Sequence, residues 1–541
     1  THPLSIAEIV LNIGTYIQTW VEQHPSHEQA MVFKPKDLVS AIAVNRLFRD
    51  TLTPFLWEVY AEPVVKVYAD VLKADNYHRD TPLTFVRKKI HFIRRLDFSH
   101  FNGRIHRPLE QLQLLQHNCT RLQELVLSST INIDWAGELI RANPELRVLH
   151  WTIPGIVHQM GGKDPYPTFQ SLKYLFPHRH LQILRFEGWS WGLYPLHLFH
   201  ILYNNAETLE ELGLCKYTVF GNHRGPVMNA DWSGLEDSFL AKMTEEERVE
   251  ASQFFHEPRH PLILPKVKTL HLIMPLPETC TLFRALPALE TLFVGAPLQN
   301  DVKVLRRLVR EFCPHLKSIQ NPDINSWNWD FIGYSELVVA ILVGSCPVGN
   351  LVHLALNVLH IDNSLRDGIL EHAGSLEVLE LNTNSSHDWD EVFLNLGMVL
   401  ERCGRLRKVS LFNFKRSCNV DDTKAVLQGL KSCRRLEHLT MVGYPYLTWD
   451  LQEKGGQRKV ELIKAQFEAI EEPSPSTSEV MAAQRWKERK VYRNVVMPKE
   501  QLQPPTKKLR TLVFDALTEL TDLRVVVLNE EWFERSTVCL S

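Results

Sequence analysis

Cys403-Gly-Arg-Leu406-Arg-Lys-Val409-Ser-Leu411 and Cys433-Arg-Arg-Leu436-Glu-His-Leu439-Thr-Met441 are two copies of one phrase, and this phrase decides the fold. Between the copies, residues 421–431 carry apolar side chains at every third or fourth position, which predicts a helix. The last two apolar residues of each phrase face one side of a short strand, and the first turns inward from the preceding bend. A single strand–loop–helix unit cannot bury its own apolar face. The sequence therefore predicts a solenoid of stacked units.

The leucine phrase recurs along most of the chain. Its copies begin near Leu96, Leu122, Leu146, Leu181, Leu209, Val267, Leu289, Leu316, Leu351, Leu376, Leu406, Leu436, Leu509 and Leu523. Most copies are separated by roughly 22 to 35 residues, the range of leucine-rich repeats that carry a helix on the convex side. The predicted fold class is α/β, a leucine-rich-repeat horseshoe with a parallel concave sheet and convex helices, preceded by a small all-α domain.

Three regions follow from this pattern. Residues 1–60 do not fit the repeat, 61–92 are expected to be a connecting helical segment and the entry to the array, and 93–541 form the solenoid. Two intervals within the array are too long for one repeat, so we expect insertions at about 216–262 and 452–505. The second interval contains the linker-like run Glu-Glu-Pro-Ser-Pro-Ser-Thr-Ser.

Residues 1–60 are expected to contain three short helices. The apolar residues of the first helix fall on one face, at Leu4, Ile6, Ile9, Ile13 and Ile17. A second helix is predicted over residues 37–51 with Asp37 as its N-cap, and a third element is predicted to begin at Pro54. Helices this short have too little core to stand alone, so this region is expected to bury part of its surface on something else.

The same region resembles an F-box. The resemblance rests on Leu4-Ser-Ile6-Ala-Glu8-Ile9, Ile13 and Tyr16, and most specifically on Val44-Asn45-Arg46, Phe48-Arg49 and Pro54-x-Leu56-Trp57. Together with the repeats, the chain resembles F-box leucine-rich-repeat proteins of the fungal type, which are substrate receptors of Skp–cullin–F-box ubiquitin ligases. Two departures stand out: Ala7 replaces a proline of the family pattern, and residues 18–36 look like an insertion.

The resemblance implies a receptor that performs no chemistry itself. Its F-box docks on the Skp adaptor and, through it, on cullin, while the repeats bind a target protein for ubiquitination. The residues implied to form or support the adaptor face are Leu4, Ile6, Ile9, Ile13, Leu38, Val44, Phe48, Leu56 and Trp57. Neither catalytic residues nor a cofactor are expected in the chain, and a cytoplasmic or nuclear location is expected.

Target recognition is predicted on the concave side of the sheet, because the residues between the buried strand positions face outward there. In the middle of the array these positions, with nearby aromatic residues, are Arg185, Glu187, Trp189, Trp191, His271, Phe293, His353, Glu380, Lys408, Phe412 and His438. Aromatic side chains next to arginine are typical anchors of protein interfaces.

Composition disfavours several other functions. The 60 Lys and Arg nearly balance the 63 Asp and Glu, so no overall field attracts nucleic acid or a membrane surface. No apolar run approaches the roughly 18 to 20 residues that cross a bilayer. The 24 histidines form no metal-ligand motif such as H-E-x-x-H. Four of the cysteines each precede a repeat leucine by three residues, which predicts buried free thiols: Cys119, Cys313, Cys403 and Cys433.

Two alternatives stay open. In the first, the F-box-like helices no longer bind the adaptor and only cap the repeats of an interaction scaffold, which Ala7 and the 18–36 insertion favour. In the second, the chain associates with nucleic acid through the basic residues in 485–493 and through Lys507 and Lys508, which predicts binding that weakens steeply with salt.

Overall fold

The computed structural model describes residues 7–17, 20–22, 31–61, 64, 89–99, 109–127, 133–152, 172–187, 195–215, 262–273, 281–294, 302–321, 343–358, 361–383, 391–412, 420–442, 517, 520, 522–528 and 531–534. They belong to two units, unit 1 (Thr1–Lys317) and unit 2 (Ser318–Ser541). Both predicted insertions and the repeat copy at Leu509 lie outside the described residues, apart from Leu262 at the end of the first insertion.

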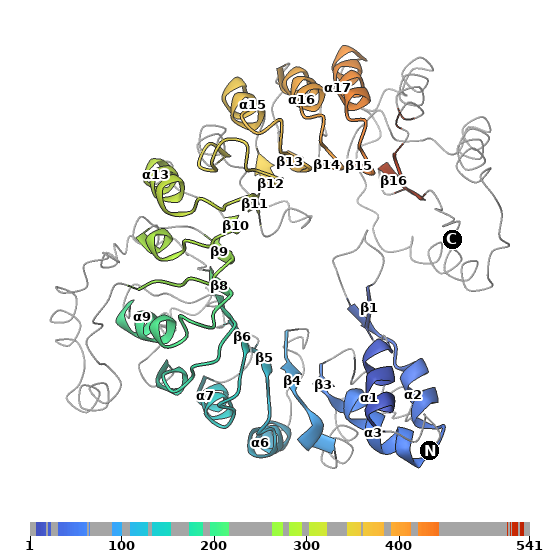
Figure 1. Ribbon diagram of the computed structural model, residues 1–541, viewed down its shortest axis with the longest axis vertical. Coiled ribbons are helices and arrows are strands. Elements are labelled where there is room, and N and C mark those ends of the chain that lie inside the picture. Colours follow the sequence, from blue (N-terminus) through green and yellow to red (C-terminus); the bar gives the residue numbers. More distant parts are fainter. Residues whose placement is uncertain are drawn as a thin grey trace. The chain divides into compact units, whose positions relative to one another are not determined.

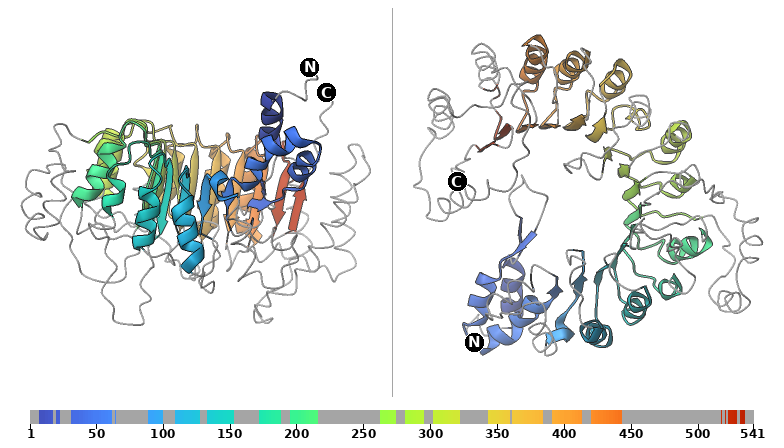
Figure 2. Two further views of the ribbon diagram at one scale, coloured as in Figure 1. Left: turned by 90° about the horizontal axis from the view of Figure 1, so that it is seen from below. Right: turned by 180° about the vertical axis from the view of Figure 1, so that it is seen from behind.

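Unit 1 contains a ladder of parallel strands in sequence order. They are β3 (Val59–Tyr60), β4 (Arg95–Asp97), β5 (Glu124–Leu127), β6 (Val148–Thr152), β7 (Ile183–Glu187), β8 (Glu211–Cys215), β9 (Thr269–Ile273) and β10 (Thr291–Val294). The helices between them are α6 (Leu109–Asn118), α7 (Ile133–Arg141), α9 (Pro195–Asn204) and α13 (Val302–Phe312), with 3₁₀ turns at Ile90–Phe92, Lys173–Leu175 and Thr281–Ala285. These helices lie on one side of the strands (Figures 1 and 2).

Unit 2 repeats the arrangement. Its parallel strands are β11 (Ser318–Gln320), β12 (His353–Val358), β13 (Val378–Thr383), β14 (Lys408–Phe412), β15 (His438–Val442) and β16 (Val525–Leu528), and β17 (Glu531–Glu534) pairs antiparallel with β16. Helices α15 (Asn363–Leu370), α16 (Glu391–Arg402) and α17 (Val420–Ser432) cover one side of these strands (Figure 1). The strand and helix order of both units confirms the predicted leucine-rich-repeat solenoid.

The repeat leucines form the core. Leu406, Val409 and Leu411 in one repeat, and Leu436 and Leu439 in the next, have no exposed surface. Each strand therefore buries its alternate side chains against the helix layer and leaves the others on the opposite side of the sheet. We call that opposite side the strand face. Because every repeat buries its leucines against its neighbours, stability is built from contacts between adjacent repeats.

Buried groups at the helix ends tie one repeat to the next. Asn143 accepts a hydrogen bond from the backbone N–H of Leu122 at 2.7 Å and donates to the Cys119 carbonyl at 2.7 Å. Asn205 accepts in the same way from the N–H of Leu181 at 3.0 Å. Since buried backbone groups need partners, these two amides fix the turns before Leu122 and Leu181.

The four predicted repeat thiols are buried and free, as expected. Burial raises the pKa of Cys119, Cys313 and Cys403 to about 12, and that of Cys433 likewise, which keeps them protonated and unreactive. Cys433 Sγ donates to the Leu400 carbonyl at 3.2 Å. The cysteines therefore serve packing between repeats.

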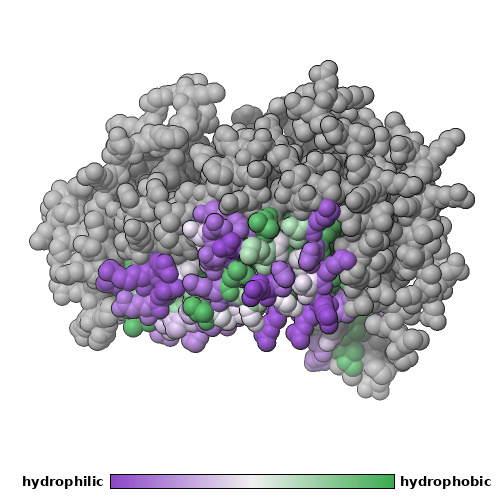
Figure 3. Space-filling model, turned by 90° about the horizontal axis from the view of Figure 1, so that it is seen from above, coloured by the Kyte–Doolittle hydropathy of each residue, from purple (hydrophilic) through white to green (hydrophobic). Residues whose placement is uncertain are grey.

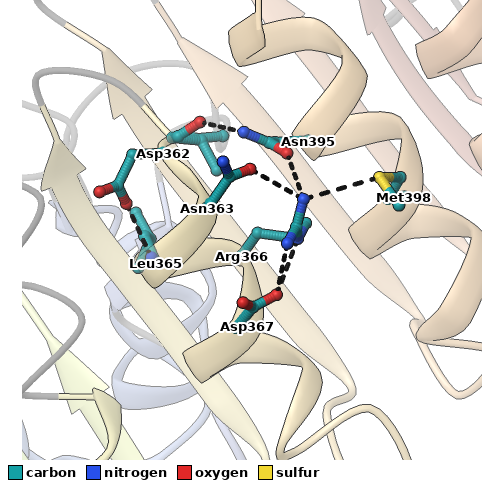
Figure 4. A network of polar contacts seen from close by, with 8 residues as sticks. Asp362, Asn363, Leu365, Arg366, Asp367, Asn395 and Met398 are labelled. Atoms are coloured by element: carbon teal, nitrogen blue, oxygen red, sulfur yellow. Dashed lines mark hydrogen bonds and ion pairs between the residues drawn. The ribbon is translucent and has the colours of Figure 1, made fainter.

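Polar side chains connect helix α15 to helix α16. Arg366 Nη1 donates to Asn363 Oδ1 at 2.8 Å and to Asn395 Oδ1 at 3.0 Å, while its Nε contacts Asp367 (Figure 4). Asn395 in turn donates to the Ile361 carbonyl at 2.9 Å. The Asp362 carboxylate caps α15 by accepting from the N–H of Leu365 at 2.8 Å. This network fixes the spacing of two adjacent repeats.

Helices α16 and α17 approach through glycine. A Cβ added to Gly429 collides with the Gly397 carbonyl oxygen, and one added to Gly397 meets the Ala425 carbonyl oxygen at 2.7 Å. The obstructing atoms are backbone, so they have little freedom to move. Glycine is required here because the two helix backbones touch.

The amino-terminal helices differ from their prediction. They are α1 (Ala7–Tyr16), α2 (Lys36–Ile42) and α3 (Arg46–Trp57). The single helix expected over 37–51 is wrong, because Asn45 is extended and caps α3 by accepting from the N–H of Phe48 at 2.9 Å. Asp37 is not an N-cap but a first-turn residue of α2. Helix α3 also continues through Pro54, which removes one intrahelical hydrogen bond, so no separate element begins there.

Helix α1 packs on the core through Val10 and Gly14, and a Cβ added to Gly14 meets Leu52 at 2.6 Å. Ile9 and Ile13, which were predicted for the adaptor face, are exposed and half-buried respectively. Leu4 and Ile6 lie outside the described residues. Part of the 18–36 segment forms a two-stranded antiparallel ladder, β1 (Trp20–Glu22) with β2 (Met31–Phe33). Phe33 packs against Ala61 and Val64.

Candidate functional site

The strand face of unit 1 carries a row of side chains that the sheet register aligns. Neighbouring strands place the same position side by side, and the row reads Asp97, Val126, His150, Arg185, Gly213, His271 and Phe293. Three of the predicted target-binding residues, Arg185, His271 and Phe293, therefore lie on adjacent or near-adjacent strands, as the repeat pattern predicts.

Glu211 joins these predicted residues. It lies at the start of β8, and its carboxylate accepts a hydrogen bond from Arg185 Nε on one side. On the other side His271 Nε2 lies 3.4 Å from the same oxygen. Burial of Glu211 acts to raise its pKa, but the nearby His271 ring and the hydrogen bond from Arg185 outweigh it and lower the pKa to about 2. Glu211 is therefore ionised at every physiological pH.

Gly213 lets Arg185 reach Glu211. A Cβ added to Gly213 meets Arg185 Cγ at 2.8 Å and Cβ at 3.1 Å, so the arginine stem crosses the sheet over the glycine. Beyond it, the rings of His271 and Phe293 stack with centroids 4.2 Å apart and planes 2° from parallel. An oriented guanidinium and a flat ring pair therefore lie along one line of the strand face.

The amino-terminal end of this row is electrically neutralised. Asp97 accepts from Ser99 Oγ at 2.7 Å and from Arg95 Nη2 at 3.0 Å, and Arg95 Nε also lies 3.5 Å from Glu124. His150, next to Arg185, has its pKa lowered to about 4 by burial and then by the Arg185 charge. His150 is therefore neutral at physiological pH.

Unit 2 carries a related cluster on its own strand face. Lys408 Nζ donates to Glu380 Oε1 at 2.9 Å, and His353 Nε2 lies 3.6 Å from the same oxygen. Burial of Glu380 acts to raise its pKa, but the nearby His353 ring and the Lys408 charge outweigh it, so the pKa is lowered. His353, Glu380 and Lys408 were all predicted as target-binding residues, and the structure brings them together.

The other predicted strand-face residues lie at the edge of these clusters or outside the described residues. His438 aligns with Lys408 and is exposed as a whole, but partial removal of its ring from water lowers its pKa. Phe412 is half-buried at the end of β14. Glu187 belongs to β7, but its side chain lies outside the described part of the chain, as do Trp189 and Trp191.

Sequence reasoning missed Glu211 although a signal was present. In Leu209-Glu-Glu211-Leu212-Gly-Leu214 it occupies the second variable position, the one that His353 and Lys408 occupy in their repeats. The same position therefore faces outward in all three repeats. Gly213 was missed because a glycine carries no chemistry of its own, and its role is visible only from the path of Arg185.

The amino-terminal helices present a second candidate surface. Five large apolar side chains are exposed there: Ile9 at 36%, Leu11 at 46%, Tyr16 at 85%, Val39 at 48% and Val44 at 62%. Of the predicted adaptor residues, Ile9 and Val44 belong to this set. Leu38 and Phe48 are instead core residues beneath it, and Leu56 packs partly buried against that core. Trp57 is also partly buried.

The helix side of unit 2 shows no comparable concentration among the residues described there. Figure 3 views the molecule from the side where α15, α16 and α17 lie in Figure 1, and apolar residues there are interspersed with hydrophilic ones. Leu394 and Met398 of α16 are exposed on their own helix. Across the residues that the structure describes, no cluster of three His, Cys, Asp or Glu could hold a metal ion, and no helix is long and apolar enough to cross a membrane.

No protein-family model matches the sequence, and no curated protein matches it. Among solved structures, a chain of the crystal structure of the Rad7 and Elc1 complex in yeast is similar at 13% identity with a TM-score of 0.31, covering 70% of this chain and 92% of that chain. A chain of the TLR13–ssRNA13 complex is similar at 14% identity with a TM-score of 0.32, covering 66% of this chain and 45% of that chain. At identities this low, function has to be inferred from the residues of this chain.

Proposed function

We propose that the chain is the substrate-recognition subunit of a cullin-RING ubiquitin ligase. Its amino-terminal helices dock on the Skp adaptor, and its strand faces bind a target protein. The chain performs no chemistry; it holds target lysines near the activated ubiquitin and so raises their local concentration. The observation that carries the proposal is the set of exposed apolar residues on helices whose sequence resembles an F-box.

The exposed set suits adaptor docking for a physical reason. Large apolar side chains that stay in water cost free energy, and their gathering on one small domain marks an interaction surface. Tyr16 and Val44 are more than half exposed, although Val10, Leu38, Phe48 and Leu52 beneath them form a proper core. The domain is therefore folded with its apolar surface available to a partner.

Co-purification with a recombinant Skp adaptor tests this proposal. Val44→Asp places a charge on the exposed surface without touching the core, so the helices stay folded while adaptor binding falls by ~10-fold or more, the effect of a buried unpaired charge. The matched control is Leu394→Asp on α16, whose side chain is similarly exposed at 55%. Adaptor binding by Val44→Asp equal to that of wild type and of the control would contradict the proposal.

A second function, an interaction scaffold without adaptor binding, is favoured by one observation. The β1–β2 ladder separates α1 from α2, where the F-box pattern has a short connection. In a scaffold, the apolar residues of the helices cover the first repeats or another protein. The wild-type chain then retains no Skp adaptor on purification, and Val44→Asp changes thermal stability alone.

A further inference from the structure

We propose that Arg185 anchors target recognition in unit 1 by binding the carboxylate of an acidic side chain of the target, with the neighbouring part of that segment resting on the His271–Phe293 ring pair. This inference rests on the proposed function, because it names the chemistry of the surface that holds the target. The occupant is an acidic segment of another protein.

The orientation of Arg185 is the first argument. Its Nε is held by Glu211, and its stem is confined against Gly213. Among the described residues, neither Nη group of Arg185 has a hydrogen-bond partner, and the side chain is 31% exposed. A guanidinium fixed through Nε presents its two Nη groups in a plane, and this fork matches the two oxygens of a carboxylate.

The balance of donors and acceptors is the second argument. These carboxylates of the strands already have positively charged or hydrogen-bonding neighbours: Glu211 has Arg185 and His271, Asp97 has Ser99 and Arg95, and Glu124 has Arg95. Within the described part of the chain, the Nη donors of Arg185 have no acceptor. A ligand rich in acceptors is therefore complementary to this part of the strand face, whereas a basic ligand finds those three described acids already paired.

The charge of the ligand is limited by Glu211. Its ionised carboxylate lies against Arg185, so the pair is close to neutral overall. A singly charged carboxylate gains the two Nη hydrogen bonds at moderate repulsion from Glu211. A phosphate with nearly two negative charges suffers about twice that repulsion. The site therefore favours Asp or Glu over a phosphorylated residue.

The ring pair supplies the second contact. His271 and Phe293 lie in the same row as Arg185, two and three strands further along the sheet. Strands are about 4.8 Å apart, so a segment lying across them reaches the rings within roughly 10 to 14 Å of Arg185. Flat rings bury large area at low entropy cost. The expected target segment therefore combines an acidic residue with an apolar or aromatic residue a few positions away.

Selection from a random peptide library displayed on phage tests the inference with the full-length chain. Wild-type protein is expected to enrich peptides with Asp or Glu, and Arg185→Met is expected to weaken the best of them by ~10-fold or more, the usual effect of losing hydrogen bonds to a charged group. Arg185→Lys keeps the charge but loses the paired Nη donors, so its affinity for these peptides should lie between those of wild type and Arg185→Met. Arg141→Met, which removes an arginine paired with Glu138 on the helix side, is the matched control.

Each outcome decides the inference. Acidic enrichment that disappears with Arg185→Met and persists with Arg141→Met supports it. Peptides without acidic enrichment, phosphopeptides that bind tighter than their Asp or Glu counterparts, or equal binding by Arg185→Met overturn it. If Arg185→Met fails to fold, Arg185→Lys decides alone. Adaptor co-purification does not depend on Arg185, so it fails only if the proposed function fails.

Discussion

Unit 1 and unit 2 each place a glutamate between a histidine and a cation on three successive strands, but they do so differently. In unit 1 the cation is Arg185, and Glu211 lies two residues before the position aligned with it. In unit 2 the cation is Lys408, and Glu380 lies two residues after the position aligned with it. Among the residues that the structure describes, the two Nη groups of Arg185 have no hydrogen-bond partner, whereas the ammonium of Lys408 is a point charge already directed at Glu380. The same three residue types on successive strands therefore leave a cation in a different environment in each unit.

The largest expected effect tests whether the two units respond separately. Leu406→Ala in unit 2 is expected to lower the free energy of unfolding by about 2 to 5 kcal/mol, because it empties a fully buried site. Hydrogen exchange measured by mass spectrometry should rise first in the repeats next to Leu406. Leu184→Ala makes the matched change in unit 1, and its effect should begin there. A uniform rise along the whole chain in either variant contradicts the account.

Acid titration compares the two glutamates next. The pKa of Glu211 falls from its ordinary 4.5 to about 2 on folding, so its contribution to stability is complete above pH 4.5 and is lost as the pH falls toward 2. The contribution is on the order of 3 kcal/mol. Glu211→Gln should flatten stability against pH in this window. Glu380→Gln should also flatten the dependence of stability on pH, since the pKa of Glu380 is likewise lowered. An unchanged pH dependence of stability in Glu211→Gln would contradict the pairing of Glu211 with Arg185 and His271.

Glycine substitutions then separate rigid from adaptable contacts. Gly429→Ala in unit 2 drives a methyl group into the Gly397 carbonyl oxygen, and overpacking of this kind costs about 1 to 3 kcal/mol. Gly213→Ala in unit 1 meets a flexible arginine stem instead, so it should displace Arg185 at a smaller cost in stability. Thermal unfolding checks both, with Gly404→Ala, which meets nothing within 4 Å, as the control. Equal losses in all three variants would refute the distinction.

The smallest effect concerns the exposed charges at the strand starts. In unit 1, Glu290 lies between Lys268, at 3.2 Å, and Lys317; in unit 2, Arg407 donates to Glu437 at 2.8 Å. Lys268→Ala should lower stability by less than about 1 kcal/mol, and the difference from wild type should vanish in high salt. A loss of stability in Lys268→Ala that persists in molar salt would show that Lys268 contributes through packing of its side chain and not through its ion pair with Glu290.

The repeat architecture could be predicted because one local pattern carries it. Leu406, Val409 and Leu411 specify a strand and its buried side, and the same spacing recurs from Leu96 to Leu523. Outward-facing positions follow from that alternation, which is why Arg185, His271, His353, Glu380 and Lys408 were predicted correctly as strand-face residues.

What could not be predicted depends on contacts between distant residues. The ion pair of Arg185 with Glu211 requires the register of β7 on β8 and the absence of a side chain at Gly213. In the amino-terminal helices, Asn45 interrupts a periodicity that otherwise runs from Asp37 to Thr51, and a single capping hydrogen bond decides that break. The burial of Val10 and Gly14 in α1 likewise depends on the close approach of Gly14 to Leu52.

The central claim is that the amino-terminal helices hold an adaptor while the strand faces hold a target. Isothermal titration of a purified Skp adaptor into the full-length chain tests it most directly. We expect saturable binding of one adaptor per chain, lost in Val44→Asp and retained in Leu394→Asp and Arg185→Met. Absence of binding at every concentration that keeps both proteins in solution would contradict it.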